Sequence, residues 1–193
     1  MPRISAPTVA EHRAAQRAAL VRAGEAELLE SGLAGVTPRS VCERAGLSRS
    51  SFYDYFPSRD DLLVAIAIDA IERWAADLDE ALEAADPGLP ELRAYVDAVL
   101  RMTAEGRHKL ADALRDAPLS PSSLDGLMVL HDTLLRPVHR VLRDLGIPDS
   151  MTTATLVQSV LGAGVQLVSH GADPRAVGAD VFGLLTRGIL PTS

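Results

Sequence analysis

Residues 37–63 read TPRSVCERAGLSRSSFYDYFPSRDDLL, and this stretch decides the fold of the chain. It places Thr37 directly before a proline, a usual start for a helix because proline suits the first helical position. The short helix predicted there ends at Gly46. Ser48 can cap a second helix, which runs to Phe56 and stops because another proline follows. Two helices joined by a short turn that contains glycine form a helix-turn-helix.

Four of the chain's seven aromatic residues lie within positions 52–56. Phe52 and Phe56 are four residues apart and therefore share one helix face, which we expect to be buried. Their expected neighbours in the core are Leu20, Leu28, Val41 and Leu62. Tyr53 and Tyr55 lie off that face, and each carries a hydroxyl that can donate to a phosphate oxygen. The cluster therefore predicts two buried anchors beside two exposed phenols.

Helical patterns cover the rest of the chain, and no stretch alternates as a strand does. A first amphipathic helix is predicted over Arg13 to Glu30, with a stop at Gly32. Another helix is predicted from Ser58 towards Ala85, directly after the helix-turn-helix. Proline and glycine separate further helical stretches near 91–116 (with a second break at Gly106), 122–145, 150–170 and 174–189.

The charges of the chain are distributed unevenly. The net charge is −7, but residues 1–59 carry eight arginines against six acids, so that this part has a charge of +2 and the remainder −9. A mildly basic head on an acidic body is expected when one end of a protein meets a polyanion. Two interpretations stay open for Arg3, Arg13 and Arg17, which could form a basic arm or a solvated tail.

Composition excludes several classes of protein. With 193 residues, of which 47% are hydrophobic, the chain is long enough to bury a core. The single cysteine, Cys42, cannot form an internal disulfide, and no signal-peptide or membrane-spanning run is found, so we expect a cytoplasmic protein without a membrane partner. The five histidines lack metal-binding spacing, and no nucleophile elbow or phosphate loop is present. We therefore expect no catalytic residues, no metal and no cofactor.

Residues 20–63, and above all the quoted stretch, resemble the N-terminal domain of the TetR (tetracycline repressor) family of bacterial transcriptional regulators. The Ala-Gly-Leu-Ser turn of that family stands here at residues 45–48, and its Tyr-x-His/Tyr-Phe sequence stands at residues 53–56. The Lys or Arg before the next helix is Arg59. Departures are mild, with Val41-Cys42 where Ile-Ala is usual and Ser50-Ser51 where Gly-Thr is usual.

The resemblance implies an all-α fold, in which an N-terminal three-helix helix-turn-helix DNA-binding domain precedes a larger helical ligand-binding and dimerisation domain. The arm and helix-turn-helix would occupy residues 1–59 and the second domain residues 60–193. Transferred by position, the phosphate contacts are Thr37, Arg39, Tyr53, Tyr55 and Arg59. The residues that would face base edges in the major groove are Arg49, Ser50, Ser51 and Asp54.

The last two helical stretches carry more apolar surface than one thin body would bury. The family pairs its two final helices into a four-helix dimer bundle, and an ordinary intrachain core is the alternative. The expected interface residues are Leu156, Val160, Gly164, Val168, Val177, Val181, Leu184 and Leu185. Residues that could line a ligand cavity, or belong simply to the core and surface, are Trp74, Tyr95, Met102, Met128 and His131.

Two functions follow from different classes. The first is a homodimeric repressor that binds palindromic double-stranded DNA and is released by an unknown small-molecule effector. The second is an all-helical small-molecule-binding or catalytic protein with an incidental helix-turn-helix. DNA binding by the purified protein would favour the first, and turnover of a metabolite without DNA binding would favour the second.

Overall fold

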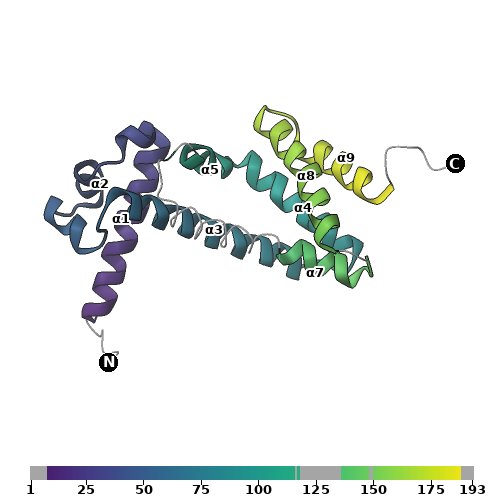
Figure 1. The fold of residues 1–193 in the computed structure, drawn as a ribbon, viewed down its shortest axis with the longest axis horizontal. Helices are drawn as coiled ribbons and strands as arrows, with labels where there is room; N and C mark the ends of the chain where they lie inside the picture. Colours follow the sequence, from purple (N-terminus) through teal and green to yellow (C-terminus); the bar gives the residue numbers. More distant parts are fainter. Residues whose placement is uncertain (1–7, 116, 118–135, 148–149, 188–193) are drawn as a thin grey trace, which may run out of the picture. The chain divides into compact units, whose positions relative to one another are not determined.

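A computed structural model describes residues 8–115, 117, 136–147 and 150–187, and every regular element among them is a helix (Figure 1). This confirms the all-α fold predicted from the sequence. The elements are α1 (Val9–Gly35), α2 (Pro38–Ala45), the 3-10 helix η1 (Arg49–Asp54), α3 (Arg59–Glu83), α4 (Leu89–Ala104), α5 (His108–Arg115), α7 (Arg136–Asp144), α8 (Ser150–Ser169) and α9 (Pro174–Arg187). Within these residues, no helix is long and apolar enough to cross a membrane.

The chain divides into two compact units, and each has a hydrophobic core of its own. Among the described residues, the first unit contains 8–70, 110–115 and 117, and the second contains 71–109, 136–147 and 150–187. Helix α3 begins in the first unit and ends in the second. The predicted domain boundary between residues 59 and 60 stays a prediction.

Helix α1 is longer than the hydrophobic pattern predicted. It begins four residues before Arg13 because Thr8 and Glu11 form a capping box, in which each side chain accepts a hydrogen bond from the other's backbone N–H. Gly32, the predicted stop, adopts a left-handed φ of 66° and kinks the helix. After the kink the backbone resumes helical geometry, and α1 ends at Gly35. The prediction stopped too early because the hydrophobic pattern alone does not show that one more turn can form after the kink.

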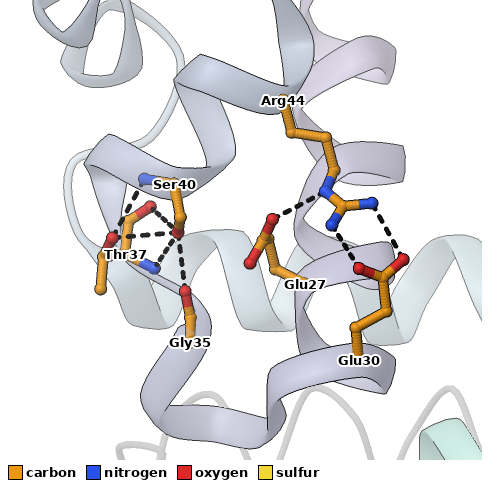
Figure 2. A network of polar contacts seen from close by, with 6 residues as sticks. All are labelled: Glu27, Glu30, Gly35, Thr37, Ser40 and Arg44. Atoms are coloured by element: carbon orange, nitrogen blue, oxygen red, sulfur yellow. Dashed lines mark hydrogen bonds and ion pairs between the residues drawn. The ribbon is translucent and has the colours of Figure 1, made fainter.

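Helix α2 has the bounds and caps that the sequence predicted. Thr37 and Ser40 form a capping box, and the Ser40 hydroxyl also donates to the Gly35 carbonyl oxygen at 2.6 Å (Figure 2). Gly46 ends the helix in the left-handed conformation, with a φ of 69°. The turn between α2 and η1 therefore has the geometry that a helix-turn-helix needs.

The second helix of this motif differs from the prediction, which extended it from Ser48 to Phe56. It is instead a 3-10 helix over Arg49–Asp54. The Ser48 hydroxyl contacts the hydroxyls of Ser50 and Ser51 rather than capping the backbone. A proline follows Phe56, so the segment is too short to form enough hydrogen bonds to offset the cost of nucleating an α-helix.

The first core forms around the two phenyl rings of the helix-turn-helix, as predicted. Phe52 and Phe56 are 0% and 2% exposed. Their cluster includes the expected neighbours Leu20, Leu28, Val41 and Leu62. Helices α1 and α3 approach closely at Gly24, where an added Cβ would lie 2.9 Å from Ile66 Cδ1. A large side chain at this position would separate the two helices.

The second core lies around α4, which contacts α7, α8 and α9. Gly106, with a φ of 82°, interrupts the predicted stretch 91–116, so that α4 and α5 are separate helices as expected. Of the predicted stretch 122–145, only α7 falls within the described residues. Helices α8 and α9 match the predicted stretches 150–170 and 174–189 to within two residues.

Candidate nucleic-acid interface

The segment η1 presents a polar face above the buried phenyl rings. Arg49, Ser50, Tyr53 and Asp54 are exposed, whereas Ser51 is half-buried. Phe52 and Phe56 hold the segment on the core and leave Tyr53 and Asp54 between them on the surface. Arginine, serine and aspartate can all form hydrogen bonds with base edges in the major groove.

Helix α2 is held on α1 by a three-residue ionic cluster (Figure 2). Arg44 Nε donates to Glu27 Oε1 at 2.7 Å, and its two terminal nitrogens donate to the Glu30 carboxylate at 3.0 and 2.5 Å. The hydrogen bonds from Arg44 lower the pKa of Glu30. Because both acids neutralise Arg44, this arginine positions α2 rather than attracting DNA. Sequence reasoning did not single it out, since its partners lie 14 and 17 residues away.

Thr37 and Arg39, two predicted phosphate contacts, lie on the surface of α2 and its cap. The Thr37 hydroxyl already takes part in the capping box. Arg39 Nε donates to Glu43 Oε1 at 2.8 Å in a pair whose side chains are 76% and 65% exposed. Such exposed pairs contribute little, so Arg39 can exchange its carboxylate partner for a phosphate.

Tyr55 and Arg59 were also predicted to contact phosphate, but both side chains form hydrogen bonds within the chain. The Tyr55 hydroxyl donates to Gln16 Oε1 on α1. The Arg59 guanidinium donates to the Leu33 carbonyl oxygen, and its Nε is buried without a hydrogen-bond partner. Both side chains therefore join α1 to the elements that follow it, a role that the motif does not reveal.

The predicted ligand residues are found in the second core where the structure describes them. Trp74 is half-buried against this core, and Tyr95 and Met102 are buried in it. The Tyr95 hydroxyl accepts a 2.6 Å hydrogen bond from Gln158 Nε2, and burial raises the pKa of Tyr95 to about 12. Met128 and His131 lie outside the described residues. Across the described ranges, no group of His, Cys, Asp or Glu side chains could hold a metal ion.

The predicted dimer residues divide into two groups. Four of them are buried within the chain's own second core, namely Gly164, Val168, Val177 and Val181. Leu156 and Leu184 are 61% and 39% exposed, and Val160 and Leu185 are half-buried. Leu167, which was not among the predicted residues, is 57% exposed on α8. The surface that a second subunit could cover is therefore the outer face of α8 and part of α9.

Residues 20–66 match the family of bacterial regulatory proteins known as the tetR family. These residues form an N-terminal domain of the TetR family. The matched residues contain α2, η1 and the start of α3, so they carry the whole helix-turn-helix described above. This confirms the resemblance seen in the sequence.

HTH-type transcriptional regulators from Mycobacterium bovis and Mycobacterium tuberculosis are 36% identical to this chain over 64 residues. The match covers 33% of this chain and 27% of theirs, so the chain aligns with about a quarter of the length of these relatives.

Two solved structures extend the likeness beyond the N-terminal part. FadR from Bacillus subtilis, solved in complex with stearoyl-CoA, has a TM-score of 0.75 at 18% identity, covering 90% of this chain and 99% of that one. The TetR family regulator PfmR from Thermus thermophilus has a TM-score of 0.68 at 21% identity, covering 89% and 99%. At these identities the likeness shows the fold.

Proposed function

We propose that this TetR-family chain is a repressor that binds a palindromic operator as a homodimer and leaves it when a small-molecule effector binds. The observation that carries the proposal is the polar face of η1, which stands on the buried rings of Phe52 and Phe56. A segment anchored in this way can enter the major groove without losing its own packing.

The side chains of η1 supply the chemistry for reading DNA. Arg49 can donate two hydrogen bonds to one guanine, and Asp54 can accept from a cytosine amino group. Ser50 and Ser51 can bond to either kind of base edge. Tyr53, Thr37 and Arg39 would hold the phosphates on either side, which sets the orientation but carries no sequence information.

The outer face of α8 supports the proposed homodimer. Leu156 and Leu167 expose more than half of their surface there, and Leu184 on α9 is also exposed. Covering such side chains with a second copy of the chain would remove apolar surface from water, which favours association. A twofold dimer would place two η1 segments against two half-sites of a palindrome.

The second unit would hold the effector. Its core contains an apolar cluster and the polar Tyr95–Gln158 pair, a combination suited to orienting a largely apolar molecule. The structural relative FadR was solved with stearoyl-CoA, so acyl-CoA molecules are a reasonable first class to test. The effector releases DNA only if it binds the released conformation more tightly than the DNA-bound one.

Footprinting on the DNA upstream of the chain's own gene tests the proposal. We expect an inverted repeat whose half-site centres lie about 34–36 Å apart, or a small multiple of this distance. Arg49→Ala should weaken binding to this site strongly, while Arg101→Ala on α4, which removes an exposed arginine from the second unit, should not. A reporter gene behind the site should be repressed.

Turnover of a metabolite without DNA binding would overturn the proposal and favour a catalytic protein with an incidental helix-turn-helix. A protected site without twofold character would contradict the homodimer alone.

A further inference from the structure

We propose that Arg13 on α1 is the phosphate-binding donor beside η1, in place of the Tyr55 hydroxyl. The inference rests on the DNA binding proposed above. It assigns a DNA contact to a helix that lies outside the helix-turn-helix, and it removes one contact that the sequence motif suggests.

The Tyr55 hydroxyl is already used. A phenol has one proton to donate, and Tyr55 donates it to Gln16 Oε1 on α1. The Tyr55 side chain is half-buried against the first core. A phosphate contact from this hydroxyl would therefore break an internal hydrogen bond for each one it formed.

Arg13 lies directly over the same ring. Its guanidinium carbon is 5.5 Å from the Tyr55 ring centroid, within the range of a cation–π interaction. Its Nη2 donates to the Asp54 carbonyl oxygen at 3.3 Å, at the end of η1. Arg13 is nevertheless exposed. Because a guanidinium carries five N–H donors, these contacts orient the group and leave most of its donors for an anion.

Three other arginines near the motif are neutralised or engaged, whereas Arg49 in η1 itself is left for base edges. Arg44 is bound by two carboxylates, Arg39 pairs with Glu43, and Arg59 is directed at a backbone carbonyl. Arg13 has no carboxylate partner among the described residues. Its charge therefore remains uncompensated beside the polar face of η1, where a DNA strand would pass, and binding a phosphate there would release a counterion.

The chain offers a matched control on the same helix. Arg22 is also exposed, and it follows Arg13 by nine residues. At 3.6 residues per turn, nine residues correspond to about two and a half turns, so the two arginines project from opposite sides of α1. Changing either to glutamine alters the net charge equally, but only Arg13 contacts η1.

The experiment measures binding of a fluorescein-labelled duplex from the upstream region of the chain's own gene, between about 50 and 200 mM salt. For Arg13→Gln, affinity should fall about tenfold and the slope of log affinity against log salt should flatten by about one unit. Tyr55→Phe keeps the ring under Arg13 and should change affinity by less than about twofold. Arg22→Gln should behave as the parent does, and Arg13→Lys should restore the slope. Thermal melting of each variant checks that the first unit stays folded.

Three results would overturn the inference. The first is an unchanged slope for Arg13→Gln in a folded protein, which would leave Arg13 only as packing for Tyr55. The second is a larger loss of affinity for Tyr55→Phe than for Arg13→Gln, and the third is an equal loss for Arg22→Gln and Arg13→Gln. These results leave the proposed DNA binding intact, whereas a parent protein that binds no duplex overturns both.

Discussion

The rings of Phe52 and Tyr53 meet edge to face, with centroids 5.3 Å apart and planes inclined by 76°. Phe52 is fully buried, whereas 58% of Tyr53 is exposed. These two neighbours in η1 therefore have different tasks, because one fills the core and the other faces the solvent from which DNA would approach. Substitutions at the two positions should separate stability from binding.

Tyr53→Phe should weaken DNA binding without unfolding the first unit. It removes one hydroxyl and keeps the ring against Phe52, so the binding free energy should become less favourable by about 1 kcal/mol on every duplex. The salt slope should not change, because a neutral phenol displaces no counterion. Phe52→Ala is the contrast, since its cavity should lower the free energy of unfolding by about 3–5 kcal/mol. Binding equal to that of the parent after Tyr53→Phe would show that this hydroxyl does not contact DNA.

Arg44→Ala should lower the melting temperature more than Arg39→Ala does. Arg44 joins α2 to two acids on α1, and one of these, Glu27, is only 13% exposed. Arg39 has a single exposed partner on its own helix. Arg44 lowers the pKa of Glu30 in the folded chain. The stability that the Arg44–Glu30 pair contributes is therefore present above the ordinary glutamate pKa and is lost as the pH falls through the lowered value. Melting at neutral and acid pH checks both points, and equal effects from the two variants would contradict them.

Gly164→Ala and Gly162→Ala should have opposite effects on stability. At Gly164 an added Cβ would lie 3.0 Å from Val181 Cγ2 and 3.2 Å from Val177 Cγ1, so these packed valine side chains must shift by a few tenths of an ångström. We expect a loss of about 1–3 kcal/mol in the free energy of unfolding. At Gly162 an added Cβ has no neighbour within 4 Å, and alanine should stabilise the helix by about 1 kcal/mol. Urea unfolding of both variants measures the difference, and similar values would disprove the packing described here.

Leu167→Asp tests the dimer without disturbing the second core. The side chain is 57% exposed on α8, so an aspartate is tolerated by the isolated chain but not beneath a second copy. We expect a folded monomer in light scattering and a loss of operator affinity. Leu89→Asp is the control, because Leu89 is 49% exposed and belongs to α4, which is not part of the proposed interface. A dimer unaffected by Leu167→Asp would mean that subunits associate through another surface.

Tyr95 should make the second unit less stable at high pH. Burial raises its pKa from 10.0 to about 12 in the folded chain. The neutral phenol therefore contributes fully to the free energy of unfolding below pH 10. This free energy should decline by about 2–3 kcal/mol in total as the pH rises from 10 to 12. Urea unfolding of the parent and of Tyr95→Phe across this range measures the effect. Tyr95→Phe removes the hydrogen bond with Gln158, so its free energy of unfolding should be about 1 kcal/mol lower than that of the parent at pH 8. Its free energy of unfolding should also depend less on pH, because the titrating hydroxyl is gone.

Local signals in the sequence were sufficient to predict the helix-turn-helix. Thr37, Gly46 and the pair Phe52 and Phe56 act within one or two turns of the chain, so their neighbours in the sequence determine what they do. The structure confirms three predictions that rest on such local signals, namely the bounds of α2, the break at Gly106 and the burial of both phenyl rings. The conversion of the second helix to a 3-10 helix was missed, since caps predict where a helix starts but not its type.

The sequence by itself determined where the helices lie and which aromatic residues anchor them, but only the tertiary structure decided which donors remain for DNA. Tyr55 and Gln16 are 39 residues apart, and no local pattern indicates that the tyrosine hydroxyl is occupied. The same holds for Gly164, for which the apolar pattern left both a subunit interface and an intrachain core open, and which lies against Val177 and Val181 of α9 in its own chain. Helix periodicity identifies an apolar face, whereas the partner of that face depends on packing between distant segments.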